Sequence, residues 1–189
     1  MTAGASKIET LKARRFERLV MPHLDSAYNL ARWLTRNDAD AQDVVQEAML
    51  RAFKYFDGFD GRYARAWILK IVRNTCFTWL HENRLPSDAV SLEENPDAID
   101  RDEGVVQRNA EGMGRSPELV VAEIHDARQL AVLINELPPA YREVIILREM
   151  EDLSYREIAY ISGVPIGTVM SRLARARQML HMGLRKLSR

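Results

Sequence analysis

The sequence has little of several residue types, and each shortage excludes a class of protein. It has one cysteine, Cys76, which excludes a disulfide framework and a cysteine-built zinc site and indicates a reducing compartment. Glycine (9) and proline (7) are scarce among the 189 residues, which is typical of a helical chain and not of a low-complexity one. No stretch approaches the roughly 20 apolar residues of a membrane span, and the N-terminus lacks the pattern of a secretory leader. We therefore predict a cytosolic, helical protein.

Net charge is also absent, but the charges are unevenly distributed. The 27 basic and 27 acidic side chains cancel over the whole chain. Residues 1–86 carry a net charge of +4, residues 87–127 carry −8, and residues 128–189 carry +4. Two basic blocks on either side of an acidic strip indicate two anion-binding modules and a linker.

The middle of the chain has the composition of a linker. Residues 87–116 are acidic, contain no aromatic residue and show no sustained apolar period, so they bury too little surface to offset the entropy of ordering. We predict an all-α protein of two small helical domains, residues 1–86 and 117–189, joined by a flexible acidic linker over residues 87–116.

The N-terminal block has helical periodicity with a break at Pro22. One helix is predicted to begin at Asp40. A loop punctuated by glycines, residues 56–61, precedes another helix that starts near Tyr63 and alternates basic and aromatic side chains. Such a helix is typical of single-stranded nucleic-acid binding, where phosphates meet cations and unstacked bases meet rings. Trp67 could serve that role or pack in the core.

The C-terminal block predicts a helix-turn-helix. Ser154 and Glu157 have the spacing of a capping box, and Gly163 follows Ala159 by four residues, as a left-handed turn between two close helices requires. The last helix carries six basic and no acidic residues from Pro165 to Arg189, with an apolar stripe from Ile166 predicted to face inward. Its outward face would enter a major groove. That face carries Thr168, Met170, Ser171, Arg172 and Arg175.

Two motifs, in this order, resemble those of the extracytoplasmic-function (ECF) sigma factors of bacterial RNA polymerase. The resemblance covers roughly residues 12–84 and 117–187, which correspond to the family's regions 2 and 4. The region 2 motif is DAQDVVQEAM at residues 40–49, continued by AWILKIVRNT at 66–75. The region 4 motif is LP at 137–138, YREV at 141–144 and LSYREIA at 153–159, continued by GTVMSRLARAR at 167–177.

The resemblance implies a role for particular residues. Asp43, Gln46 and Glu47 match the helix face that docks on the largest subunit of core polymerase. The loop and Asn74 match the element that captures a flipped base of the minus-ten strand. The Asn74 amide can form hydrogen bonds with the donor and acceptor groups on the edge of that base, and nearby cations would bind the phosphates. The minus-ten set is Asp57, Gly58, Phe59, Asp60, Gly61, Arg62, Arg65, Trp67, Lys70, Arg73 and Asn74.

The minus-thirty-five element would be read by the last helix. The implied set is Thr168, Met170, Ser171, Arg172, Ala174 and Arg175. Met170 and Ala174 stand where some members place a basic and a larger residue, so DNA shape and phosphate contacts are expected to carry more of the recognition. The implied partners are core RNA polymerase, promoter DNA and an anti-sigma factor that controls a stress-responsive promoter set and can hold the chain near the membrane.

Other classes of function were weighed against this one. Asp43 and Glu47 share a helix face, but no histidine stands one turn from either, and the four histidines are scattered. We therefore predict no catalytic residue, no metal site and no cofactor. A stand-alone helix-turn-helix regulator is the main alternative, and it would need a ligand pocket or dimer seam in the N-terminal block. An adaptor that binds polymerase without opening DNA is a third possibility.

Overall fold

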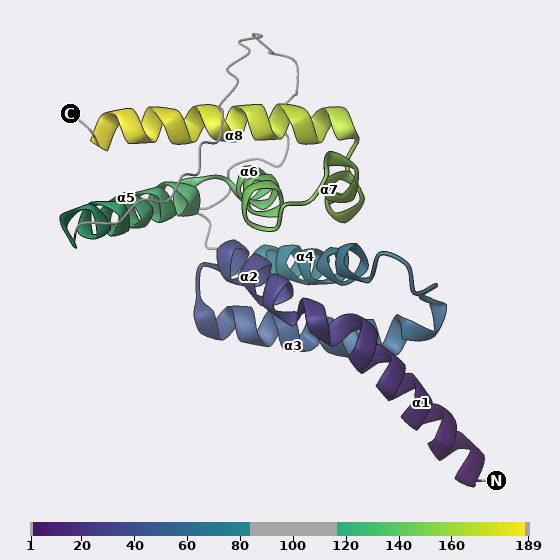
Figure 1. Ribbon diagram of the computed structural model, residues 1–189. Coiled ribbons are helices and arrows are strands. Elements are labelled where there is room, and N and C mark those ends of the chain that lie inside the picture. The colour runs from purple at the N-terminus through teal and green to yellow at the C-terminus, as the bar shows by residue number, and fades with distance from the viewer. Residues whose placement is uncertain (1, 84–116, 188–189) are drawn as a thin grey trace.

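The computed structural model describes residues 2–83 and 117–187, with side chains described over residues 9–83 and 127–187. Two groups of helices follow one another along the chain (Figure 1). We call residues 2–83 the N-terminal unit and residues 117–187 the C-terminal unit. No strand occurs in these two ranges, as the all-α prediction requires. The predicted linker, residues 87–116, lies outside the described residues.

The helices are bounded as follows. The N-terminal unit contains α1 (Thr2–Val20), a 3-10 turn (Met21–His23), α2 (Leu24–Thr35), α3 (Asp38–Tyr55), a second 3-10 turn (Phe56–Gly58) and α4 (Ala64–Asn83). The C-terminal unit contains α5 (Pro117–Glu136), α6 (Pro139–Ile145), a π-helical turn (Ile146–Met150), α7 (Tyr155–Ser162) and α8 (Ile166–Leu187).

The N-terminal unit is a bundle of α2, α3 and α4, which pack against one another. Buried apolar residues recur three and four positions apart, which places them on one face of each helix. On α2 they are Ala27, Leu30, Ala31 and Leu34. α1 runs away from the bundle toward its N-terminus (Figure 1), and Phe16 anchors its other end with edge-on ring contacts to Phe53 and Phe56 at 5.3 and 5.2 Å.

α3 begins two residues earlier than the sequence pattern predicts. The structure starts the helix at Asp38 and not at Asp40, because Asn37 is the N-cap. The Asn37 side-chain oxygen accepts hydrogen bonds from the backbone N–H groups of Ala39 and Asp40 at 2.8 and 3.2 Å. The acidic first turn also suits the positive end of the helix dipole.

The C-terminal unit contains the predicted helix-turn-helix, formed by α7 and α8. Ser154 and Glu157 form a capping box at the start of α7, and Gly163 ends that helix at φ +69°, a conformation that costs a residue with a Cβ far more than glycine. The prediction for the first residue of the inward stripe was wrong. Ile166 is 41% exposed because it is the first residue of α8 and precedes the part of the helix that packs in the core, whereas Val169 and Leu173 are buried.

The two units lie against each other. α7 packs on α4 and α6 packs on α2, so α6 and α7 cover one side of the N-terminal bundle, and α8 lies on the far side of them (Figure 1). In the described part of the chain, no helix is both long enough and apolar enough to cross a membrane.

Candidate nucleic-acid interface

The loop after α3 is held by contacts within the N-terminal unit. Gly61 has φ +86°, so the chain turns at a position that suits glycine. The Asp60 carboxylate accepts hydrogen bonds from the Arg62 backbone N–H at 2.8 Å and from Arg62 Nε at 3.0 Å, and these bonds lower the pKa of Asp60. Lys12 Nζ donates to Asp57 at 2.6 Å from α1. The loop is therefore braced before any ligand is bound.

Two aromatic residues of the predicted minus-ten set pack on each other. The Phe59 and Trp67 rings are stacked with centroids 4.4 Å apart. Phe59 is only 7% exposed and Trp67 is half-buried. Phe59 therefore packs on the buried side of the loop, while Asp57, Gly58 and Arg62 are exposed to solvent.

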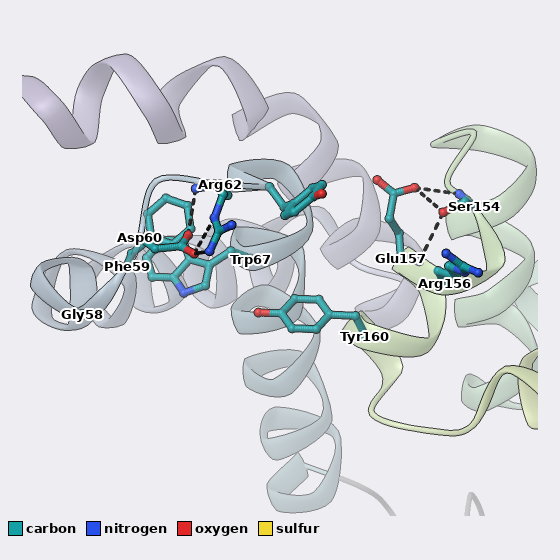
Figure 2. Close-up of a pocket in the computed structure, with 10 residues that line it drawn as sticks. Gly58, Phe59, Asp60, Arg62, Trp67, Ser154, Arg156, Glu157 and Tyr160 are labelled. Carbon is teal, nitrogen blue, oxygen red and sulfur yellow. Dashed lines mark hydrogen bonds and ion pairs between the residues drawn. The ribbon is translucent and has the colours of Figure 1, made fainter.

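A cavity of about 720 Å³ opens between the loop and α7 (Figure 2). One side consists of Arg156, Glu157 and Tyr160. The other side consists of Gly58, Phe59, Asp60, Arg62, Tyr63 and Trp67. Figure 2 shows the Tyr160 ring reaching from α7 toward α4. The sequence did not predict the residues that α7 contributes to this cavity, because no local pattern in the sequence indicates that α7 lies next to the loop.

Arg65, at the start of α4, is bound by the C-terminal unit. Its Nη2 donates to Glu151 at 2.5 Å and to the Ser26 hydroxyl at 3.3 Å. Glu151 also accepts a hydrogen bond from Asn29 at 2.6 Å. Burial raises the pKa of Glu151, but hydrogen bonds from Asn29, Ser26 and Arg65 outweigh it, so the pKa lies below its usual range. The carboxylate is therefore charged at neutral pH, and its contribution to stability is lost only as the pH falls through that lowered pKa.

Arg73, two turns further along α4, is bound in the same way. Its Nε donates to Glu143 Oε1 at 2.9 Å, and its guanidinium lies 4.0 Å from the Phe77 ring centroid. Glu143 is fully buried and also accepts a hydrogen bond from the Ser162 hydroxyl at 2.7 Å.

The remaining predicted residues of α4 differ in exposure. Lys70 is half-buried, with its Nζ 4.2 Å from the centroid of the Tyr160 ring. Asn74 is exposed, and its Oδ1 accepts a hydrogen bond from Arg73 at 3.3 Å. Asn74 is therefore the member of this face that solvent reaches most freely.

Cys76 lies on the buried side of α4. Burial and the charge of Glu143 raise the pKa of its thiol to about 12. The residue packs in the core of the N-terminal unit.

The predicted minus-thirty-five face of α8 lies outward. Met170, Ala174 and Arg175 are exposed, while Thr168, Ser171 and Arg172 are half-buried. The Ser171 hydroxyl donates to the Thr168 carbonyl at 3.0 Å, and Arg175 donates to Gln178 at 3.1 Å.

The predicted polymerase-docking residues also lie outward, on α3. Asp43, Gln46 and Glu47 are exposed, and Glu47 forms an ion pair with Arg51 one turn away. Within the described residues, no group of three or more histidine, cysteine or acidic side chains is arranged to hold a metal ion.

Arg142, on α6, is a residue that sequence reasoning quoted in a motif but gave no role. It is fully buried, and each of its five N–H groups reaches a backbone carbonyl. Two acceptors belong to α2 and three to the end of α5 and the turn after it. The acceptors are the carbonyls of Trp33, Leu34, Ile134, Asn135 and Leu137, at 2.6 to 3.3 Å.

The guanidinium of Arg142 therefore lies where the C-terminal ends of two helices converge. The partial negative charges of those helix ends offset its buried positive charge. Burial and the charge of Arg36 lower the pKa of Arg142 to about 9, so it stays protonated at neutral pH.

Comparison with known proteins assigns each unit to a known module. The model of "Sigma-70 region 2" matches residues 19–85, and that of "Sigma-70, region 4" matches residues 127–180. Relatives include the ECF RNA polymerase sigma-E factor of Haemophilus influenzae, 35% identical over 84% of this chain and 80% of that protein. The sigma-H factor of Pseudomonas aeruginosa is 30% identical over 93% of this chain and 89% of that protein.

One relative is much longer than this chain. The match to the ECF sigma factor SigE of Mycolicibacterium smegmatis, 30% identical, covers 92% of this chain but 63% of that protein.

Solved structures have the same arrangement of helices. The sigma factor RpoE of Bartonella quintana, in complex with the anti-sigma factor NepR, matches with a TM-score of 0.64 and 25% identity over 90% of this chain and 96% of that one. CnrH in complex with the cytosolic domain of CnrY matches with a TM-score of 0.62 and 25% identity over 94% of this chain and 97% of that one.

The fold and the two matched modules define a sigma-70-type factor built from regions 2 and 4. Its relatives are named ECF sigma factors. The chain belongs to the ECF family of RNA polymerase sigma factors.

Proposed function

We propose that this chain binds core RNA polymerase, directs it to a limited set of promoters and helps to open the DNA at the minus-ten element. The observation that carries the proposal is the exposed, acid-free face of α8, presented by a helix-turn-helix whose cap and turn are both formed. The polymerase supplies the chemistry, and the chain supplies contacts.

Each contact is proposed for a surface described above. The exposed acidic face of α3, with Asp43, Gln46 and Glu47, docks on the polymerase. The loop and α4 bind the minus-ten strand, and α8 binds the minus-thirty-five duplex. The functional domains are residues 1–86 and 117–189, with residues 87–116 as the linker.

An anti-sigma factor is proposed to control the chain in the cytoplasm. Support comes from the solved structure of the sigma factor RpoE in complex with the anti-sigma factor NepR, to which this chain is similar. The alternative of a stand-alone regulator is not favoured, because a sigma region 2 model matches the N-terminal unit.

Run-off transcription with purified core polymerase tests the proposal. Genomic fragments that bear promoters are transcribed with and without the chain. We expect discrete transcripts only when it is present. DNA binding without transcripts and without association to core polymerase would instead establish the stand-alone regulator.

Arg175→Ala is expected to weaken binding of the holoenzyme to a minus-thirty-five duplex and to reduce the slope of log affinity against log salt by about one. The exposed Arg175 on α8 loses a phosphate contact, and with it about one released counterion. Affinities are measured over a series of salt concentrations. Arg185→Ala, which removes an exposed arginine from the far end of the same helix, is the control. An unchanged slope for Arg175→Ala would exclude a phosphate contact there.

A further inference from the structure

Two uncharged, apolar side chains lie on the outward face of α8. Met170 is 53% exposed, and Ala174, four positions further along, is also exposed. Residues four positions apart lie on the same side of a helix, on successive turns. The residues that α8 contributes to the core are Val169, Leu173 and Ala176, which are buried. Met170 therefore presents its apolar surface on the proposed DNA-binding face and not to the core.

The polar side chains beside them already have partners within α8. The Ser171 hydroxyl donates its only proton to the Thr168 carbonyl at 3.0 Å, so it is left with acceptor capacity alone. Arg175 Nη1 donates to the Gln178 side chain at 3.1 Å. Methionine and alanine side chains carry no N–H or O–H donor. At the two apolar positions, contact with an apolar group of the ligand is therefore the recognition that the face can offer.

The charge of α8 determines what can lie against this surface. Residues 166–187 contain no acidic side chain, and Arg175 and Arg185 are exposed. α8 lies beyond α6 and α7 as seen from the N-terminal unit, so its outward face stays open (Figure 1). A polyanion with apolar groups between its rows of phosphates suits both the cations and the methionine. Duplex DNA entered through its major groove is such a ligand.

The edges of the bases in the major groove carry one apolar group, the C5 methyl of thymine. An apolar side chain packed against this methyl removes both surfaces from water. Cytosine presents an N4 amino group in the same groove, and a methionine placed against that donor would leave it without a partner. The apolar part of the face thus favours thymine over cytosine without any hydrogen bond.

We propose that Met170, with Ala174 beside it, reads thymine in the minus-thirty-five duplex through the C5 methyl group. The inference rests on the proposed function for the position of the duplex on α8. Four residues of helix rise about 6 Å and successive base pairs are about 3.4 Å apart, so the two side chains reach over about two base-pair steps. One or two methyl groups at neighbouring positions are therefore read, while Arg175 binds a phosphate.

Replacing thymine with deoxyuridine tests the proposal, because uracil pairs with adenine as thymine does and lacks only the methyl group. Duplexes that bind are first selected from a random library with the full chain, alone and with core polymerase. Each thymine of a selected duplex is then replaced in turn, and the affinity is measured by fluorescence anisotropy. We expect a loss of about 3- to 5-fold at one or two neighbouring positions and no change at the others.

Met170→Ala identifies the residue that senses the methyl group. The variant is expected to bind the thymine duplex about 3- to 5-fold more weakly and to lose the preference for thymine over uracil at one of these positions. Met182→Ala is the matched control, since Met182 is a methionine of the same helix with a similar exposed fraction, 49%. The control is expected to keep the full preference for thymine.

The outcomes separate this inference from the proposed function. Tolerance of uracil at every position overturns the inference, and so does a preference for thymine that Met170→Ala leaves unchanged. A library without any enriched sequence also overturns it, because Met170 then reads no base. If the preference depends on Met170 while run-off transcription yields nothing, the reading of thymine stands and the proposed function fails.

Discussion

Replacing Asn74 with alanine is expected to leave binding to core polymerase unchanged and to lower the yield of open complexes at duplex promoters about tenfold or more. The Asn74 side chain is exposed on α4, and an amide can both donate to and accept from the edge of an extruded base. A good paired contact of this kind contributes about 1–3 kcal/mol, which corresponds to a factor of roughly 5 to 150. Permanganate footprinting of the minus-ten region measures the melted fraction.

Asn83→Ala is the control for Asn74→Ala. Asn83 ends the same helix, and its side chain donates to the Trp79 carbonyl at 2.9 Å. The control is expected to melt promoters normally. A template with a preformed bubble should partly restore initiation by the Asn74 variant, because the cost of unpairing has been removed. Normal melting of duplex DNA by Asn74→Ala would exclude base capture by this residue.

Replacing Arg142 with alanine is expected to lower the free energy of unfolding by about 3–5 kcal/mol. The substitution leaves five carbonyls without their buried donor and opens a cavity the size of the guanidinium. Urea denaturation followed by circular dichroism measures the loss. Arg142→Lys keeps the charge but not the planar arrangement of five donors, so we expect it to recover less than half of the stability.

Arg148→Ala is the control that shows whether the loss of stability is specific to Arg142 or follows the removal of another arginine. Arg148 lies in the π-helical turn next to α6, and the one backbone carbonyl it bonds is that of Leu153, at 2.8 Å. Its removal is expected to cost about 1 kcal/mol. Equal losses for the two alanine variants would contradict the role given to the five carbonyls.

The helix-turn-helix could be predicted from the sequence because its determinants are local. The capping box needs two side chains three positions apart, and the turn needs one residue that tolerates a positive φ. Ser154, Glu157 and Gly163 meet these requirements within ten residues of each other. The predicted start of α3 at Asp40 is two residues late, because the prediction does not use Asn37 as the N-cap.

The candidate site was less predictable because much of it depends on contacts between distant segments. The sequence predicts Phe59 as a loop residue of the minus-ten set, but the structure buries it with its ring stacked on Trp67. The sequence assigns no partner to Glu143 or Glu151, whereas the structure pairs them with Arg73 and Arg65 of α4. Arg142 likewise has no sequence signal, since its partners are backbone carbonyls and not side chains.

The position of Cys76 has a consequence for how this chain can sense oxidants. Burial raises the pKa of the Cys76 thiol to about 12, so the thiol stays protonated at neutral pH, whereas the thiolate is the form that reacts with peroxides and disulfides. The side chain is also fully buried. Since this is the only cysteine in the sequence, a change in cellular redox state has no direct cysteine target here.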